Sequence, residues 1–389
     1  MINARQRRGQ RRLALILAGA AVAAIAVTGC SSSGGNSGGG GSGNSSGSTS
    51  SSSAAGVAWA KALIAKYGTR PTSIPSGTAI TTPVPTGKNI AFINCPVASC
   101  GTYVPVVQKA ADVLGWKLEV VPTDGTPESQ KQAWATVFRK GYDGVIFDNV
   151  ERPVIDAELK QAASKGLFTV GWEVDFPAGE GLSSKVGGLD MTALWGEIGA
   201  AEMIAESNGK GNALLATVTS IPAAKSAADG YLAAVRAHCP DCSADLLDIP
   251  LTALGKDVPQ RIVSALRAKP NHYNYLPLGI GPLLQGLPSA LSAASIKQPH
   301  IITLGSTDPD IMQAISDGQM DATVGASIYG EFWAAIDALA RHFTDTPQIS
   351  QEMRVDPWVI TKSAVLSTTD RYPFVADMVD QYKRAWGRS

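Results

Sequence analysis

The sequence predicts an α/β protein built from two domains, each containing a parallel β-sheet. The chain has 389 residues, which is more than one hydrophobic core ordinarily holds. From Lys88 onward, short apolar segments of strand length alternate with longer segments of helical pattern, as in βαβ units with parallel strands. The alternation restarts at Met191, so two α/β halves of similar size follow each other.

The first half opens with the apolar segment NIAFIN, which is typical of a buried strand. Gly141 and Gly166 mark the ends of two helices, because glycine commonly follows a helix. The expected strands of this half are Asn89–Asn94, Lys117–Pro122, Gly144–Phe147 and Phe168–Gly171, and the expected helices are Val104–Leu114, Ser129–Lys140 and Val154–Lys165.

The second half repeats the same alternation. Its expected strands are Ala213–Val218, Ala244–Ile249, Tyr273–Leu276, His300–Leu304, Ala322–Ala326 and Val355–Ile360. Its expected helices are Met191–Glu206, Ala223–Ala237, Val258–Ala268, Leu283–Ala293, Ile311–Asp317, Glu331–Phe343 and Phe374–Trp386.

The amino terminus has the pattern of an export signal. Five arginines precede an apolar run of 15 residues, Leu13–Val27, and small residues follow it. These arginines are Arg5, Arg7, Arg8, Arg11 and Arg12. The run is too short to span a bilayer comfortably. We therefore expect residues 1–29 to be a signal peptide.

A polar segment separates this signal from the body. Ser31–Ser53 contains only Ser, Gly, Asn and Thr, so it has nothing to bury and is expected to be a disordered tether. Ala54–Gly68 is rich in alanine and predicts a short helix. Thr69–Gly87 contains several prolines and predicts an extended lead-in that packs on the surface, because proline is excluded from regular helices and central strands.

The charge balance excludes an obvious nucleic-acid interface. The formal charge of the chain is zero, and loss of the five arginines of the signal leaves 28 of the 33 basic residues against 33 acidic residues. Acidic residues are then in excess and the sequence contains no basic stripe, so we expect no nucleic-acid partner.

Motifs of enzymes and of metal sites are absent from the sequence. There is no P-loop, and Pro282 interrupts the dinucleotide-like start Gly279–Gly281. The histidines are far apart and show no spacing typical of metal ligands; they are His238, His272, His300 and His342. We therefore expect neither enzymatic activity, nor a cofactor, nor a bound metal.

The residues that end the signal, Val27-Thr28-Gly29-Cys30, resemble the lipobox of bacterial lipoproteins. In that family the signal is cut before the cysteine, which then carries lipid. The resemblance implies a protein anchored through Cys30 to the outer face of the cytoplasmic membrane, with residues 30–87 as tether and lead-in. The alternative is an ordinary secretory signal with a chance cysteine.

The body resembles the type I periplasmic binding proteins, the ribose- and galactose-binding group. An ordered set of segments carries the resemblance: NIAFIN with Gln108–Val121, then Lys140–Asn149, Ala223–Val235 and His300–Ser327. It implies two doubly wound domains joined by a hinge of three crossovers. The implied domains are residues 88–188 plus 327–356 and residues 189–326 plus 357–389, with crossings near Gly187–Asp190, Ala326–Ser327 and Asp356–Trp358.

The family binds its ligand between the two domains, and physics favours the same place. Parallel sheets bind ligands beyond the carboxyl ends of their strands, where helix N-termini offer free N–H groups. In the first half, the strand ends and the resemblance together point to Asn94, Ser99, Thr102, Tyr103, Asp148, Trp172, Glu173 and Asp175. The alternative interpretation is that Tyr103 and Trp172 pack within the protein and do not contact the ligand. Sugar binders of the family carry an Asp-Arg pair where this chain has Glu173 and no arginine.

In the second half, the same reasoning points to Lys225, Thr307, Asp308, Ser327 and Tyr329. Lys225 takes the position of an arginine of the family, although its point charge lacks the planar fork of a guanidinium. An exposed helix lysine is the alternative. Gly305 stands near the place of an aspartate of the family, so Thr307 or Asp308 must substitute for it. These departures leave the identity of the sugar open.

The five cysteines suit an oxidising compartment. Pairing of Cys95 with Cys100 and of Cys239 with Cys242 leaves Cys30 for lipid. The spacing of Cys239 and Cys242 is also that of redox motifs, but no helix N-terminus follows to lower a thiol pKa. A structural disulfide is therefore expected there, and a four-thiolate zinc site is the remaining alternative.

The sequence thus predicts a monomeric, lipid-anchored solute-binding protein that captures a small polar ligand, a sugar or polyol, for an ABC importer permease. A sensory receptor of the same fold, which presents its ligand to a membrane signalling protein, is the main alternative. A structural or adhesive lipoprotein that binds no small ligand is a third.

Overall fold

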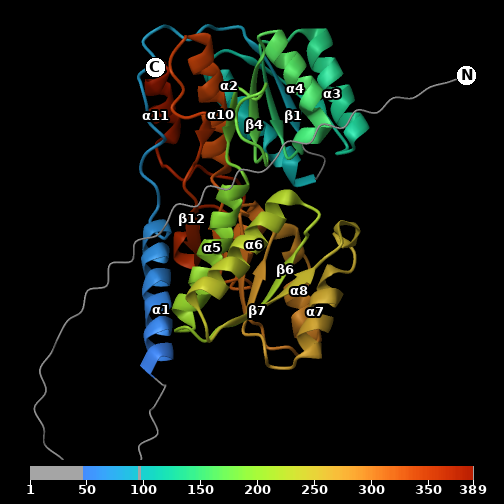
Figure 1. Cartoon of the computed structure of the whole chain (residues 1–389), viewed down its shortest axis with the longest axis vertical. Helices are drawn as coiled ribbons and strands as arrows, with labels where there is room; N and C mark the ends of the chain where they lie inside the picture. The colour runs from blue at the N-terminus through green and yellow to red at the C-terminus, as the bar shows by residue number, and fades with distance from the viewer. Residues whose placement is uncertain (1–46, 95–97, 389) are drawn as a thin grey trace, which may run out of the picture. The chain divides into compact units, whose positions relative to one another are not determined.

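The computed structural model describes residues 47–94 and 98–388. Within these residues the strands form two six-stranded sheets, each flanked by helices, and so confirm the predicted α/β fold with two parallel-sheet domains (Figure 1). The expected signal peptide, Cys30 and most of the expected tether lie outside the described residues.

The first domain is built on a sheet with only parallel pairings among its described strands. Its strands are β1 (Asn89–Asn94), β2 (Lys117–Pro122), β3 (Gly144–Asp148), β4 (Phe168–Trp172), β5 (Ser184–Val186) and β11 (Glu352–Met353). Their order across the sheet is β11-β5-β4-β3-β1-β2.

Helices cover both faces of this first sheet. Ile90 and Phe92 of β1 pack in one apolar cluster with α2 (Val104–Val113) and α10 (Ile328–Phe343). The intervening residues of β1 pack on the opposite face with α3 (Pro127–Lys140) and α4 (Arg152–Ser164). This alternation is the period of two of an extended strand, with both faces buried.

The second domain repeats this plan with one antiparallel strand. Its strands are β6 (Asn212–Thr217), β7 (Ser243–Asp248), β8 (Tyr275–Leu278), β9 (His300–Leu304), β10 (Ala322–Gly325) and β12 (Trp358–Thr361). Their order is β12-β10-β9-β8-β6-β7, and β12 runs antiparallel to β10. One face packs with α5 (Leu189–Glu206) and α6 (Pro222–His238). The other packs with α7 (Val258–Ala268), α8 (Leu287–Ala293) and α9 (Pro309–Ser316).

The described chain passes between the two sheets three times. It leaves the first sheet after β5, where Gly187 and Gly188 have positive φ angles of 71° and 148°. It returns through α10 after β10, and crosses again between β11 and β12. The three crossovers implied by the resemblance are therefore present, whereas the residue limits of the two domains stay a prediction.

Several elements differ from the sequence predictions. The short strands β5 and β11 were not expected, and β12 begins later than the strand predicted at Val355–Ile360. The helix predicted at Leu283–Ala293 is divided, because Gly286 adopts a left-handed conformation (φ 73°) just before α8. The last helix, α11 (Met378–Ala385), was assigned to the second domain but packs against α10, with the ring of Trp386 stacked on Trp333 at 5.5 Å. Short 3-10 helices occupy Ala98–Thr102, Leu251–Ala253, Gly281–Leu284 and Lys362–Ala364.

The segment before β1 packs on both domains. Helix α1 (Gly47–Tyr67) starts inside the expected tether and lies along α5 and α6 (Figure 1). Trp59 of α1 stacks on His238, with ring centroids 3.7 Å apart. The helix begins before the predicted Ala54–Gly68, and the burial of Val57, Ala60 and Tyr67 stabilises it, because tertiary packing supplies most of the stability of a helix.

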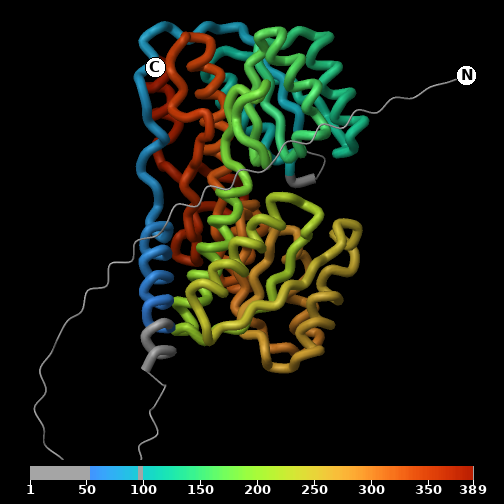
Figure 2. Tube along the Cα trace, viewed as in Figure 1, coloured from blue at the N-terminus to red at the C-terminus, as the bar shows by residue number. Residues whose placement is uncertain are grey.

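The proline-rich lead-in continues from α1 to the first domain, as Figure 2 shows in blue. Arg70 donates to the carbonyl of Phe374 at 2.6 Å, Arg341 of α10 donates to the carbonyl of Thr78 at 2.7 Å, and Trp116 donates to that of Pro85 at 2.7 Å. Hydrogen bonds between side chains and backbone carbonyls, in both directions, therefore hold the lead-in on the body.

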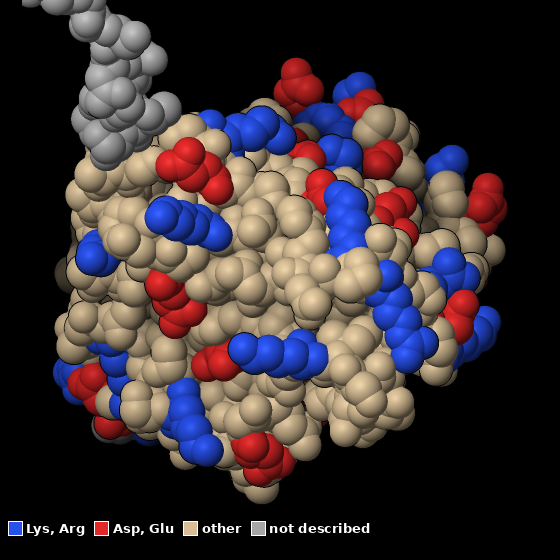
Figure 3. All heavy atoms as spheres, turned by 90° about the horizontal axis from the view of Figure 1, so that it is seen from below, with Lys and Arg blue, Asp and Glu red and all other residues tan. Residues whose placement is uncertain are grey.

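The remaining sequence predictions concern the cysteines and the surface. Cys239 and Cys242 form a disulfide with Cα atoms 5.3 Å apart, whereas Cys95 lies outside the described residues. On the face drawn in Figure 3, basic and acidic side chains are interspersed rather than gathered by sign. Within 47–94 and 98–388, no helix is both long enough and apolar enough to cross a bilayer.

Candidate functional site

A cavity of about 570 Å³ lies at the carboxyl ends of the strands of both sheets. Residues from the loops after β1, β2, β3 and β4 line it from the first domain, and residues from the loops after β6, β7, β8 and β9 line it from the second. This is the place at which open parallel sheets bind ligands, and the volume falls in the range of small-molecule sites.

Aromatic rings form one wall of the cavity. The Tyr103 and Trp172 rings lie edge to face, with centroids 5.2 Å apart, and Phe332 of α10 supports Trp172 at 4.8 Å. Trp172 is only 2% exposed, so it is both a core residue and a lining residue. The two interpretations offered by the sequence therefore apply together.

Buried carboxyl groups lie behind this wall. Trp172 Nε1 donates to Glu331 Oε2 at 2.6 Å, which fixes the indole orientation. Burial raises the pKa of Glu331, and burial together with the carboxylates of Glu331 and Asp148 raises the pKa of Glu173 well above its ordinary value. Glu173 lines the cavity, so its protonated form presents a hydroxyl donor as well as an acceptor.

Arg371 connects the two domains beside the cavity. It lies in the irregular segment between β12 and α11, and its guanidinium pairs with Asp308 and donates to Thr307 Oγ1 at 3.2 Å, both in the second domain. Its Nε donates to Thr102 Oγ1 of the first domain at 3.1 Å. The guanidinium also lies 5.2 Å from the centroid of the Tyr103 ring. One side chain thus joins both walls of the site.

Asp308 is held by opposing electrostatic effects. Burial raises the pKa of its carboxyl group, and the Arg371 guanidinium acts in the opposite direction. Because Arg371 also lines the cavity, it supplies the planar cation that the sequence lacks after Glu173.

Gly305 leaves no room for an acidic side chain at its own position. Its φ angle is 94°, a conformation that favours glycine, and a Cβ atom there would lie 2.5 Å from the Trp195 ring. An aspartate side chain at this position would collide with Trp195. Trp195 itself lines the cavity and was not expected from the sequence.

The structure brings only part of the expected set to the cavity. Tyr103, Trp172, Glu173, Thr307 and Asp308 line it. Thr102 and Asp148 act on residues of the lining rather than forming it. Thr102 accepts a hydrogen bond from Arg371, and the charge of Asp148 raises the pKa of Glu173. Asn94 is buried and donates to the carbonyl of Cys100, which lines the cavity.

Other expected residues lie outside the lining. Lys225 pairs with Asp229 on the exposed side of α6, as in the alternative interpretation of an exposed lysine, and Asp175 is exposed. Ser327 is buried at the start of α10, and the Tyr329 ring lies 6.0 Å from Lys109 Nζ. The side chain of Ser99 lies outside the described part of the chain.

The family model for the periplasmic binding protein domain matches residues 103–346, which is more than half of the chain. The chain belongs to this family. The resemblance inferred from the sequence segments is therefore confirmed, and with it an extracytoplasmic class of binding proteins rather than of enzymes. A search of curated proteins finds no significant match.

Solved structures of sugar-transport binding proteins share the fold. The 5-methylthioribose transporter solute-binding protein from Thermotoga lettingae, in complex with 5-methylthioribose, has a TM-score of 0.64 at 17% identity, covering 79% of this chain and 96% of its own. An ABC transporter solute-binding protein from Actinobacillus succinogenes with bound D-allose has a TM-score of 0.62 at 17% identity, covering 72% and 99%. A carbohydrate transporter from Acidothermus cellulolyticus in complex with myo-inositol has a TM-score of 0.58 at 17% identity, covering 77% and 99%.

Proposed function

We propose that this chain captures a sugar or polyol in the cavity between its two domains and delivers it to an ABC importer. The observation that carries the proposal is the lining itself, in which aromatic rings, carboxyl groups and a guanidinium converge from both sheets. The sugars and the polyol named for the similar solved structures support the ligand class.

The lining suits the two faces of a polyhydroxylated ring. Tyr103 and Trp172 offer apolar surface to its C–H groups, and Glu173, Asp308 and Arg371 offer donors and acceptors to its hydroxyls. Thr307 adds a neutral hydroxyl. A site of a few polar groups on a mostly apolar wall is the usual plan of small-ligand sites.

Arg371 gives the proposal a mechanism of closure. Because its guanidinium contacts both domains, a ligand that engages it favours the arrangement in which the two walls meet. The three crossovers between the sheets then act as the hinge.

A thermal-shift panel of sugars, polyols, nucleosides and amino acids tests the ligand class. A ligand that binds only the folded state raises Tm by mass action, so a sugar or polyol is expected to give the largest rise. Asp308→Asn should remove that rise, whereas Asp317→Asn, an exposed aspartate just after α9, should keep it. A panel with no responding sugar or polyol would contradict the proposal.

We further propose that Cys30 carries the lipid that holds the protein at the outer face of the membrane. The lipobox-like sequence before it supports this. Mass spectrometry of the mature amino terminus should find a lipid-modified Cys30, and Cys30→Ala should release the protein from the membrane fraction. An unmodified Cys30 in membrane-bound protein would contradict the anchor.

Uptake of the responding ligand tests the importer. Loss of this chain from its host should abolish uptake at low ligand concentration. Unchanged uptake combined with a lost transcriptional response would instead favour a sensory receptor.

A further inference from the structure

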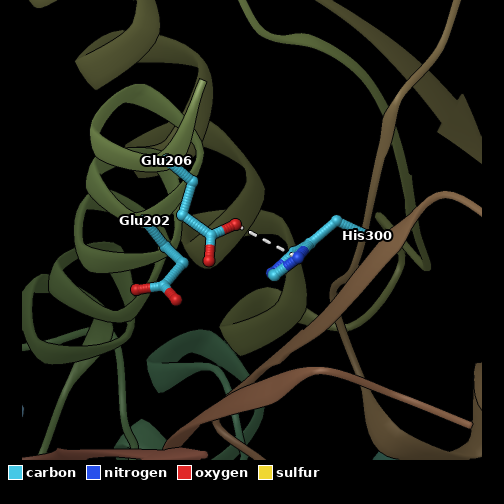
Figure 4. A group of neighbouring side chains, drawn as sticks. All are labelled: Glu202, Glu206 and His300. Atoms are coloured by element: carbon cyan, nitrogen blue, oxygen red, sulfur yellow. Dashed lines mark ion pairs between the residues drawn. The ribbon is translucent and has the colours of Figure 1, made fainter. Parts of the chain in front are cut away.

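Three side chains of the types that bind metals lie close together at the edge of the second sheet opposite the cavity. Glu202 and Glu206 project from the last turns of α5, and His300 is the first residue of β9, as Figure 4 shows. One ligand atom from each of the three lies within 4.8 Å of the other two. The cavity is lined by residues beyond the other end of β9, so the cluster is separate from the proposed sugar site.

Glu202 is a buried carboxylate aimed into this cluster. The residue is 7% exposed, and its side chain has no hydrogen bond or ion pair with any described residue. Buried carboxylates are normally paired or bound to a metal, which makes Glu202 a candidate cation ligand.

The two ring nitrogens of His300 have different surroundings. Nδ1 lies 3.1 Å from Glu206 Oε2 and 3.8 Å from Asp321 Oδ2. Nε2 is buried and lacks a hydrogen-bond partner among the described residues. Asp321 Oδ2 accepts the backbone N–H of Ile301 at 2.7 Å, which holds this third carboxylate beside the cluster.

The two glutamates have the spacing of a helical ligand pair. Residues four positions apart lie on one face of a helix, where two like charges repel each other. A cation between them replaces that repulsion by attraction. The sequence did not indicate this site, because His300 lies far from the glutamates along the chain and reaches them only through the packing of α5 on the sheet.

We propose that Glu202, Glu206 and His300 bind a divalent first-row transition-metal ion, for which Zn²⁺ is the probe. Imidazole nitrogen combined with carboxylate oxygen favours such ions over Ca²⁺ or Mg²⁺. Tetrahedral coordination at the usual bond lengths separates ligand atoms by about 3.4 Å. The ligand atoms of the cluster lie within 4.8 Å of one another, and rotation of the half-exposed Glu206 side chain can bring its carboxylate closer to the other two. The bound ion links the end of α5 to β9, and Asp321 or water completes its coordination.

Calorimetric titration of the untagged full-length protein with ZnCl₂, after treatment with chelator, tests the site. We expect one Zn²⁺ per chain, with weaker binding of Ca²⁺. Glu202→Gln and Glu206→Gln should each lower the affinity at least about tenfold, since even an indirect ligand contact is worth that much. His300→Gln should do the same. Glu197→Gln, on the same helix but outside the cluster, should leave the affinity unchanged.

Two results would overturn the proposal. The first is absence of Zn²⁺ and Mn²⁺ binding to the wild-type chain. The second is equal Zn²⁺ affinity in wild type and Glu206→Gln, a half-exposed position at which the substitution leaves the core intact. The readout is independent of any sugar, so it separates the metal site from the proposed ligand cavity.

Discussion

Substitution of Arg371 tests how the two domains are joined at the cavity. The Arg371 side chain is 8% exposed and that of Asp308 is 22% exposed, so the ion pair is largely buried. Removing one partner of a buried pair costs about 3–5 kcal/mol of unfolding free energy, because the other charge is left unpaired. We therefore expect this loss in Arg371→Ala.

Arg371→Lys separates the charge of this side chain from its geometry. Lysine keeps the pair with Asp308 but cannot also hold both Thr307 and Thr102. At about 1 kcal/mol for each hydrogen bond lost, the expected loss of unfolding free energy is about 1–2 kcal/mol. Ligand affinity should also fall at least about tenfold, since one lost charge-assisted hydrogen bond is worth that much.

Urea unfolding and calorimetric ligand titration measure these two effects. Arg236→Lys, at an exposed position of α6, is the matched control and should change neither quantity. The effects of Arg371→Ala and Asp308→Asn on the unfolding free energy should be non-additive by about 0.5–3 kcal/mol, the usual range for residues in contact. An Arg371→Ala variant with wild-type stability and affinity would refute the role assigned to this side chain.

Three further changes probe other parts of the structure. Burial raises the pKa of Glu331 from 4.5 to about 7. Its contribution to the unfolding free energy is therefore fully present below pH 4.5 and is lost as the pH rises through 7. Urea unfolding at about pH 5 and pH 8 should show a smaller change in unfolding free energy for Glu331→Gln than for the wild type. Gly305→Ala should lower the unfolding free energy by about 1–3 kcal/mol, because the new Cβ meets the Trp195 ring at a left-handed φ. Trp59→Ala should expose α1 to limited proteolysis, because the stacked contact with His238 is lost.

Each of these changes has a control within the chain. Glu128→Gln, on the exposed start of α3, should keep the wild-type pH dependence. Gly141→Ala shares a positive φ but meets no atom within 4 Å, so it should cost less than Gly305→Ala. Trp59→Phe keeps an aromatic ring and should preserve most of the protection of α1. Equal behaviour of a variant and its control would contradict the corresponding prediction.

Much of the fold was predictable because its central strands are buried on both faces. Segments such as Asn89–Asn94 and His300–Leu304 carry continuous apolar runs, and the helices between them have clear glycine stops. Strands β5 and β11 were missed because two or three residues show no period. The division of the helix before α8 depends on the conformation of a single residue, Gly286.

The candidate site was predictable only where it lies at a strand end. Trp172 and Glu173 follow β4 directly, and Asp308 follows β9. Arg371 belongs to an irregular segment whose path is set by tertiary packing, so local pattern gives no signal for it. Its only hint was the lack of an arginine after Glu173. Trp195 lies within the predicted helix Met191–Glu206, and the local pattern does not distinguish a lining residue from a core residue there.

The central claim is that the cavity between the two sheets binds a sugar or polyol. Its most direct test is a crystal structure grown with the compound that raises Tm most in the panel. We expect density for that ligand against the Trp172 ring, with a hydroxyl within hydrogen-bond distance of Arg371 or Asp308. A ligand bound elsewhere, with the cavity filled only by water, would contradict the account.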